Sequence, residues 1–266
     1  MKKFTTIIFF CFFVSNTFAQ VAGISASKLV AYDVNIVPKY TLEVEPSFSY
    51  LYSHQWFNNN NHLQPFNLAD DSCLVMNNFY MRFTLGLEKN LEVGTFINAD
   101  MSSFSFGAKY RLFQHKKSGL ALLAGTTFSK QSDWVYRNSG FYGKTLSLAV
   151  GFAFTQQFSP KFSWDTDLQY QNILSQDKSI TDNMFLDTDF GYYFYDHRFQ
   201  FIAGLSFNYN NHKSDKHDTY RLTFNPGVTI ETGKSYIIVV YFPIDLLGNE
   251  VERTYGFSLA FTLGVD

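Results

Sequence analysis

Cysteine and charge are both scarce in this chain. Its 266 residues include 2 cysteines, and charged residues make up 17%. Cys11 lies in an apolar run near the start, so export would leave only Cys73, and a single thiol cannot form an intramolecular disulfide. The net charge of -2 and the pI of about 6.3 provide neither a basic surface for nucleic acid nor an acidic tail. We therefore expect no binding of nucleic acid.

Long apolar stretches are also missing beyond the N-terminus, and so is any extended helical periodicity. The N-terminus itself has a basic start at Lys2 and Lys3, a short apolar run over residues 6–14, and small residues at Thr17 and Ala19. This order is typical of a secretory signal peptide, which we predict over residues 1–19 with cleavage after Ala19. An exported chain without helices is a secreted β-protein or an outer-membrane barrel.

Aromatic residues are abundant by comparison. The chain has 31 Phe, 17 Tyr and 3 Trp, and these make up 19% of its residues. A soluble core of this size would more often be filled with Leu, Ile and Val. Girdles of aromatic side chains at the two membrane interfaces would account for so many rings.

The segment at residues 255–264 has the period of a β-strand with two unlike faces. Its odd positions are large and apolar or aromatic, whereas its even positions are Gly, Ser, Ala or Thr. One face suits lipid, and the other suits a crowded or watery interior. We predict that this strand pairs with the first strand, so that the sheet closes and no edge remains.

The same alternation recurs along the chain, with connections that tend to alternate between longer and shorter. It predicts an all-β fold, namely a transmembrane antiparallel up-and-down β-barrel of about 12 strands over residues 41–266. Residues 20–40 are mixed in character, and we interpret them as a periplasmic N-terminal segment. We read residues 243–250 as a loop leading into the last strand. The predicted strands are 41–53, 74–87, 91–99, 103–113, 119–130, 144–157, 162–172, 184–195, 199–210, 219–231, 235–242 and 255–264.

A soluble secreted β-sandwich or a lipocalin-like barrel is the competing interpretation. Such a protein would have to place two or three large aromatic residues from every strand in its interior. Twelve strands of this kind would overfill the core of a single domain, whereas lipid imposes no such limit.

If the aromatic face points outward, a set of charged side chains points into the lumen. The aspartates of the strands at 162–172 and 184–195 should be cross-strand neighbours, because one loop joins the two strands. Adjacent like charges repel, so these carboxylates need either cations nearby or a raised pKa. The candidate lumen or selectivity residues are Glu43, Glu45, Arg82, Lys109, Arg111, Asp165, Asp167, Asp187, Asp189 and Arg221.

Two interpretations of these charges remain open. In the first, the acids form a salt-bridge network across the lumen with the four basic candidates, and this network holds the barrel in shape. In the second, the lumen binds or selects a cation or a polar solute. The spacing and the glycine of a calcium loop are missing, so we predict no metal site and no cofactor.

Catalytic motifs are weak. His212-Lys213-Ser214 resembles the His-x-Ser of outer-membrane phospholipases and lipid A deacylases, but it lies in a charged segment. The chain has no HExxH, no Gly-x-Ser-x-Gly and no phosphate-binding loop. We therefore predict no catalytic residue and a protein that is not an enzyme.

Several short motifs suggest a family. They are Phe18-Ala19-Gln20, the strand motif Phe106-Gly107-Ala108-Lys109-Tyr110-Arg111, the segment Phe224-Asn225-Pro226-Gly227-Val228, and the closing residues 255–264. Together they resemble the outer-membrane barrels described as transporters of the meta-pathway of phenol degradation, which are similar to hydrophobic-compound channels. The resemblance implies a passive channel for small solutes, including hydrophobic or aromatic ones.

We therefore expect a barrel in the outer membrane of a Gram-negative cell that works as a passive channel. Its partners would be outer-membrane lipid, the barrel-assembly machinery and small solutes. One alternative is a filled structural barrel whose outer loops bind a partner, and another is a lipid-modifying barrel enzyme. The oligomeric state stays open.

Overall fold

A computed structural model describes residues 21–25, 28–65, 73–130, 144–174, 180–194, 198–212, 218–231 and 236–265, and the predicted signal peptide lies outside these ranges. Within them, no helix is long and apolar enough to cross a membrane. The strands are β1 (Leu42–Phe57), β2 (Leu63–Pro65), β3 (Leu74–Glu88), β4 (Leu91–Asn98), β5 (Ser103–His115), β6 (Ser118–Lys130), β7 (Lys144–Gln157), β8 (Phe162–Leu174), β9 (Ile180–Phe194), β10 (Phe199–His212), β11 (Thr219–Glu231), β12 (Tyr236–Tyr241), β13 (Ile244–Asn249) and β14 (Val251–Val265).

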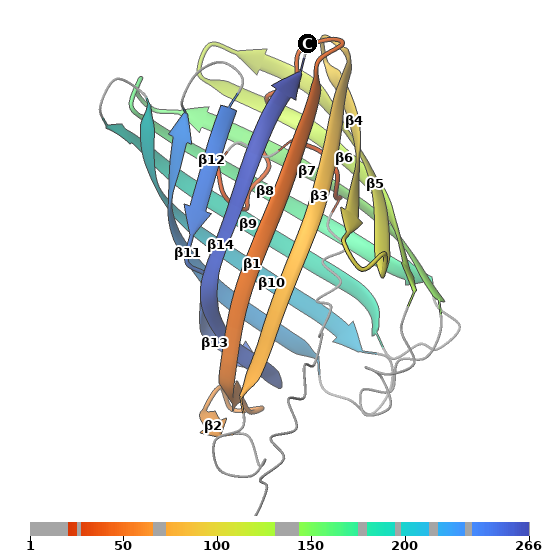
Figure 1. The fold of residues 1–266 in the computed structure, drawn as a ribbon, viewed down its shortest axis with the longest axis vertical. Coiled ribbons are helices and arrows are strands. Elements are labelled where there is room, and N and C mark those ends of the chain that lie inside the picture. Colours follow the sequence, from red (N-terminus) through yellow and green to blue (C-terminus); the bar gives the residue numbers. More distant parts are fainter. Residues whose placement is uncertain are drawn as a thin grey trace, which may run out of the picture.

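The strands form one closed antiparallel barrel (Figure 1). Most consecutive strands are neighbours in the sheet, and β14 pairs with β1 from Leu42 opposite Val265 to Phe57 opposite Val251, with a register shift after Tyr52. β12 and β13 share one position between β11 and β14, and β2 is a short addition beside the end of β1. The barrel therefore has twelve strands around its circumference, which confirms the predicted fold class and the predicted closure.

The wall departs from the prediction at residues 243–250, because β13 is a strand and not a loop. β12 ends before Phe242 and Pro243, and proline cannot donate to a strand ladder. Hydrogen bonds nevertheless continue across the break, from Phe242 N–H to the Pro226 carbonyl at 2.9 Å and from Gly256 N–H to the Pro243 carbonyl at 3.1 Å. Glu250 then turns the chain with a φ of 51°. The expected long outer loop is therefore a tight turn.

The two faces of the wall differ as the alternation predicts. In β5, Phe106 and Tyr110 are each 47% exposed on the outside, whereas Ser105 and Lys109 are buried on the inside. The same division recurs around the barrel, where the exposed set includes Phe79, Phe128, Leu148, Val150, Phe152, Leu168, Met184, Phe201 and Phe257. So many large apolar side chains on the outside would be a liability in water and suit a hydrocarbon environment.

Aromatic rings gather near both ends of the barrel. Next to the turn between β7 and β8, the rings of Trp164 and Phe190 stack with centroids 6.1 Å apart, and Phe154 meets Trp164 edge-on. Near the opposite end, the rings of Tyr52 and Tyr255 make an edge contact at 5.3 Å. Rings at both ends match the girdles expected at the two membrane interfaces.

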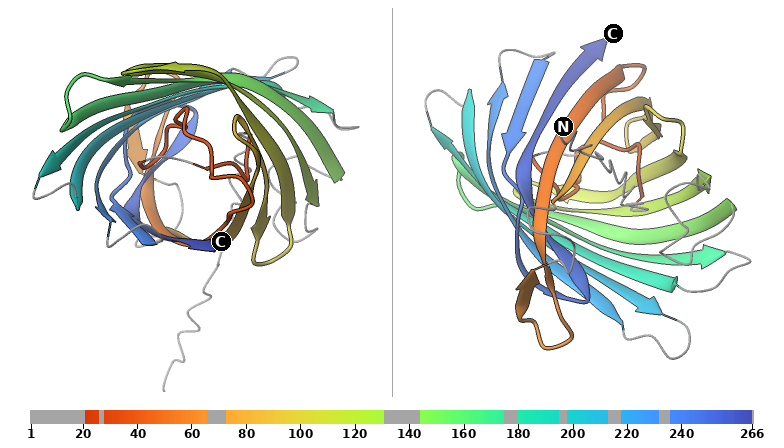
Figure 2. Two further views of the ribbon diagram at one scale, coloured as in Figure 1. Left: turned by 90° about the horizontal axis from the view of Figure 1, so that it is seen from above. Right: turned by 60° about the horizontal axis from the view of Figure 1, so that its bottom comes forward.

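The N-terminal segment, residues 21–38 without residues 26 and 27, lies inside the barrel (Figure 2). From the sequence we interpret these residues as a periplasmic N-terminal segment, whereas the structure places them in the lumen. Val21, Ile24 and Val34 pack against the inward faces of β6 and β7, in a cluster with Tyr32, Ala121, Leu123, Ala149 and Ala153. Each buried Val or Ile side chain contributes roughly 1.5–3 kcal/mol. Apolar packing therefore helps to hold the segment in the lumen.

Two glycines of the wall make room for this segment. A Cβ atom added at Gly94 would lie 1.7 Å from the Gly23 carbonyl oxygen, and one at Gly86 would lie 2.1 Å from the Pro38 carbonyl oxygen. Any side chain at these positions would therefore push the segment away. Gly23 itself has a φ of 87°, a conformation that glycine adopts without a steric penalty.

The outward face leads to a stability prediction. Val150 lies near the middle of β7 and is 59% exposed. In a bilayer, Val150→Lys should lower the free energy of unfolding by about 2–4 kcal/mol, because the ammonium group would face hydrocarbon. Urea unfolding in phospholipid vesicles measures this change, with Val150→Leu as the control. An effect within about 0.5 kcal/mol, as at an ordinary wet surface, would contradict the membrane assignment.

Candidate functional site in the barrel lumen

Four aspartates lie side by side on the inner face of β8 and β9. Asp165 is directly opposite Asp189, and Asp167 is directly opposite Asp187. All four side chains are buried. The prediction that these residues are cross-strand neighbours is thus confirmed. Buried carboxylates at such spacing require donors or cations.

The N-terminal segment supplies those donors. One carboxylate oxygen of Asp189, Oδ2, accepts hydrogen bonds from three consecutive backbone N–H groups, those of Leu29 at 3.0 Å and of Val30 and Ala31 at 2.9 Å. Successive N–H groups that converge in this way form an anion-binding concavity. Asp167 Oδ2 accepts the N–H of Tyr32 at 2.7 Å. The carboxylates therefore fix the backbone of the segment at residues 29–32.

Lys28 of the same segment forms an ion pair with Asp165. Burial lowers the pKa of Lys28 from its usual value, and the nearby carboxylates of Asp33 and Asp189 act in the opposite direction. A buried ion pair of this kind adds little net stability, but removing one partner leaves an uncompensated charge, which costs about 3–5 kcal/mol.

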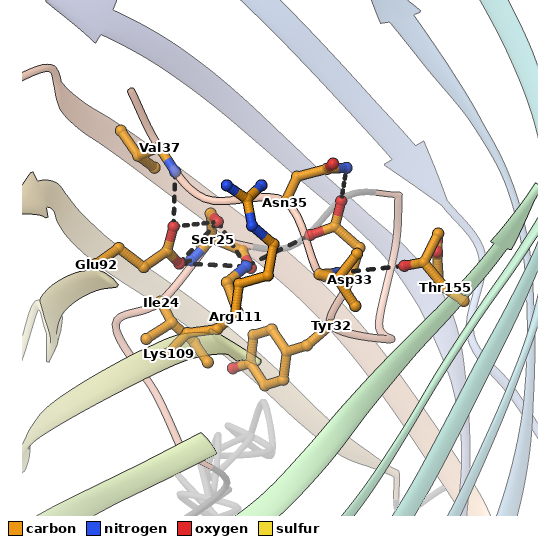
Figure 3. Close-up of polar contacts among 12 residues, drawn as sticks. Ile24, Ser25, Tyr32, Asp33, Asn35, Val37, Glu92, Lys109, Arg111 and Thr155 are labelled. Atoms are coloured by element: carbon orange, nitrogen blue, oxygen red, sulfur yellow. Dashed lines mark hydrogen bonds and ion pairs between the residues drawn. The ribbon is translucent and has the colours of Figure 1, made fainter. Parts of the chain in front are cut away.

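A second anchor lies at the start of β4 and on β5 (Figure 3). The Glu92 carboxylate accepts the N–H groups of Ser25 and Val37, both at 2.8 Å. Lys109 Nζ lies 3.2 Å from Glu92 Oε1, 3.4 Å from Asp33 Oδ1 and 3.0 Å from the Ser25 carbonyl oxygen. Glu92 and Lys109 are fully buried, and the Lys109 ammonium pairs with the carboxylates of both Glu92 and Asp33.

A third anchor is formed by Arg82 on β3. Its guanidinium donates to the Ile24 carbonyl oxygen at 2.8 Å and to Glu45 at 2.7 Å, and it lies 3.8 Å from Glu43. Thr84 donates to the Gly23 carbonyl oxygen at 2.7 Å. The segment is therefore bonded to opposite parts of the wall, β3 to β5 on one side and β7 to β9 on the other.

Arg111 and Arg221 have their described partners outside these three anchors. Arg111 donates to Asn90 and to the Lys89 carbonyl oxygen, beside the turn that ends β3. Arg221 on β11 lies 3.5 Å from Asp245 and 3.7 Å from Glu252. The candidate charges are thus brought together in several local groups, with the N-terminal segment between the acids of β8 and β9 and the bases of β3 and β5.

Sequence reasoning missed Lys28, Asp33 and Glu92. The first two lie in a segment that has no strand periodicity, and Glu92 lies in the least regular of the predicted strands. The inward glycines Gly86 and Gly94 were the available signal, because glycine in a strand often marks a close approach of another backbone.

A cavity of about 1110 Å³ remains in the lumen beside the segment. Its lining extends from Lys116 and Lys117, at the turn after β5, to Thr219 and Glu252 at the opposite end. Hydroxyl and amide side chains are numerous between these ends, beside charged and apolar side chains, and they include Ser47, Ser49, Asn78, Thr127, Ser129, Ser147, Gln171, Asn183, Asn208, Asn210, Thr223 and Asn225. Water and polar solutes fit such a surface.

Neither a metal centre nor a catalytic pair emerges from the described part of the chain. No group of three or more His, Cys, Asp or Glu side chains in it could hold a metal ion. His212 ends β10, with its Nε2 atom 3.3 Å from Thr219 Oγ1. Ser214, the other member of the predicted His-x-Ser pair, lies outside the described residues.

Comparison with solved structures finds similar outer-membrane barrels. The COG4313 outer membrane channel from Pseudomonas putida F1 has a TM-score of 0.64 at 12% identity, over 88% of this chain and 98% of that chain. The KdgM porin has a TM-score of 0.47 at 10% identity, over 83% and 99% of the two chains. The CymD monoaromatic hydrocarbon channel also has 0.47, at 9% identity over 85% and 89%.

The first of these similarities shows a shared fold, and the other two have TM-scores too low to support an argument. No protein-family model matches the chain, and no curated protein matches it in sequence. The resemblance to transporters of the phenol meta-pathway thus has no support at the level of a sequence family.

The bonds to Asp189 lead to a prediction about the segment. Asp189→Ala would remove the acceptor for three backbone N–H groups, each worth about 1–3 kcal/mol when buried without a partner. Loss of one such hydrogen bond lowers the free energy of local opening of the segment by about 1–3 kcal/mol. This corresponds to roughly 5–150-fold faster exchange of the amide hydrogens at residues 29–31. Hydrogen–deuterium exchange followed by mass spectrometry measures it.

Asp189→Asn keeps one acceptor oxygen and should give an intermediate rate. Asp100→Ala, at the exposed turn between β4 and β5, is the control and should leave these amides unchanged. Equal exchange in wild type and Asp189→Ala would show that the carboxylate does not hold the segment.

Proposed function

We propose that the protein is a passive channel for small solutes across the outer membrane. The observation that supports this proposal is the cavity of about 1110 Å³, whose lining includes many hydroxyl, amide and charged side chains, within a closed barrel whose outside is apolar and aromatic. Polar groups inside and rings outside are the arrangement of porin-type barrels. Outer-membrane lipid, the barrel-assembly machinery and the solutes themselves would be its partners.

In this proposal the N-terminal segment narrows the lumen and gives it its charge pattern. The segment occupies space between β3 to β5 and β7 to β9, and it engages Asp165, Asp167 and Asp189. A barrel of about twelve strands is intermediate between small filled barrels and wide porins, so the segment is what decides how much of the lumen stays free. Solutes would pass beside it, through the cavity.

A filled structural barrel whose outer loops bind a partner is the second candidate. The observation that favours it is the number of bonds between the N-terminal segment and the wall, including the buried Lys109 and Glu92 pair. A segment held this firmly, together with side chains of the outer half, could keep ions from passing. The two candidates differ in conductance.

Single-channel recording in a planar bilayer separates them. The channel proposal predicts ohmic current steps from the purified full chain. A variant without residues 21–37 should show larger steps, because the lumen it leaves is wider. Silence from the wild type would favour the filled barrel, and equal steps from both proteins would show that the segment does not limit the current.

Ion preference tests whether the lumen acids act on the passing solute. Asp187 and Asp165 line the cavity. Asp187→Lys should shift the reversal potential in a salt gradient from cation toward anion preference, because the sign of a charge at a pore wall is reversed. Asp100→Lys adds the same charge change at a turn that does not line the cavity. Equal reversal potentials in Asp187→Lys and wild type would exclude Asp187 as a selectivity residue.

A further inference from the structure

A row of polar side chains crosses four neighbouring strands in the outer half of the lumen. Gln171 on β8 is paired with Asn183 on β9, Asn183 with Asn210 on β10, and Asn210 with Thr219 on β11. All four line the cavity. Since neighbouring strands are about 4.8 Å apart, the row spans roughly 14 Å. We call these four residues the amide row.

Some donors and acceptors of the amide row have no hydrogen-bond partner among the described residues. Asn183 Nδ2 donates to Gln171 Oε1 at 2.8 Å, and Asn210 Nδ2 donates to Thr219 Oγ1 at 3.1 Å. Gln171 Nε2 and Asn183 Oδ1 are buried and have no protein partner among the described residues. A buried amide donor and a buried amide acceptor, carried by residues that are paired across β8 and β9, are therefore left without a partner at the wall of the cavity.

The next inward-facing row adds an apolar surface and another acceptor. Phe185 follows Asn183 on the same face of β9, and its ring is buried while it lines the cavity. Asn208, paired with Phe185 across β9 and β10, has an Oδ1 atom without a protein partner in the described chain. Amides beside an aromatic ring at the cavity wall suit a molecule that has hydroxyl groups at its edge and C–H groups on its faces.

The charge around the amide row favours a neutral solute. Asp165, Asp167 and Asp189 are already engaged by the N-terminal segment. Arg221, in the row below, has Asp245 and Glu252 beside it. The free groups of the amide row are uncharged, so they would bind a charged solute no better than a neutral one.

A pure hydrocarbon would fit the amide row poorly. It would displace water from the Gln171 and Asn183 amides without replacing their hydrogen bonds, which is costly for buried polar groups. A hydroxyl group both donates and accepts, so it can satisfy Gln171 Nε2 and Asn183 Oδ1 together. Several hydroxyls in line could use the whole length of the row.

We propose that the amide row is a binding site for neutral polyhydroxylated solutes, in particular short oligosaccharides. The proposal rests on the proposed channel function, because it names the class of solute that would pass through the lumen. It replaces the hydrophobic solutes that the family resemblance implies with hydrophilic ones.

Maltotriose is a suitable probe, and isothermal titration of the full chain in detergent measures its binding whether or not the lumen conducts. Binding to the wild type is expected. Gln171→Leu and Asn183→Leu keep about the same side-chain volume, and each should weaken binding by about fivefold for every hydrogen bond lost. Thr127→Val is the matched control, since Thr127 lines the cavity on β6 and already bonds to Ser105.

The same proteins are then compared in a planar bilayer. Maltotriose should interrupt the current, and polyethylene glycol of similar length, whose ether oxygens only accept, should interrupt it less. Gln171→Leu and Asn183→Leu should need higher maltotriose concentrations for half-block, whereas Thr127→Val should behave as the wild type. Far-ultraviolet circular dichroism checks that every variant keeps its strands.

The outcomes distinguish this inference from the channel proposal. Ohmic steps without maltotriose binding, or with binding that is unchanged in Gln171→Leu and Asn183→Leu, would overturn the amide row as an oligosaccharide site and leave the channel proposal standing. Binding that the two variants weaken, in a protein that gives no current, would support the amide row and overturn the channel.

Discussion

Hydrogen bonding between β1 and β14 is the constraint on which the rest of the structure depends. The pairing runs from Leu42 opposite Val265 to Phe57 opposite Val251, and it removes the last two free edges of the sheet. Hydrocarbon offers no partner for a free N–H or carbonyl group, so a sheet can cross a membrane only when it is closed. Closure also separates an outside, where aromatic and aliphatic side chains gather, from an inside that must accommodate polar groups.

The N-terminal segment supplies the partners of the buried acids in the lumen. Facing aspartates on β8 and β9 would repel one another, and the wall has few bases near them. Backbone N–H groups at residues 29–32 and the ammonium group of Lys28 are the partners of these aspartates. Glu92 and Lys109 bind the other side of the segment. The same segment therefore both pairs with lumen charges and fills part of the lumen, and hydroxyls and amides line the remaining cavity together with charged and apolar side chains.

Much of the wall could be predicted from the chain alone, because its signals are local. Alternation of large and small residues predicted which face of β5 carries Phe106 and which carries Lys109, and the spacing of such segments predicted twelve strands. The same reasoning predicted that the aspartates of β8 and β9 are cross-strand neighbours, since a single loop joins their strands, and the structure pairs Asp165 with Asp189. It failed at β13, where Pro243 reads as the start of a loop although the ladder continues past it.

What the sequence by itself determined is the barrel: its strand number, its closure and the identity of its inner face. These follow from a period of two and from the need to satisfy every backbone group. Only the tertiary structure decided what occupies the lumen, because the bonds that place Lys28, Ser25 and Tyr32 join residues 67 to 137 positions apart. Residues 21–38 have no periodicity from which such contacts could be predicted. Their position depends on the space and the hydrogen-bond acceptors that the closed wall provides.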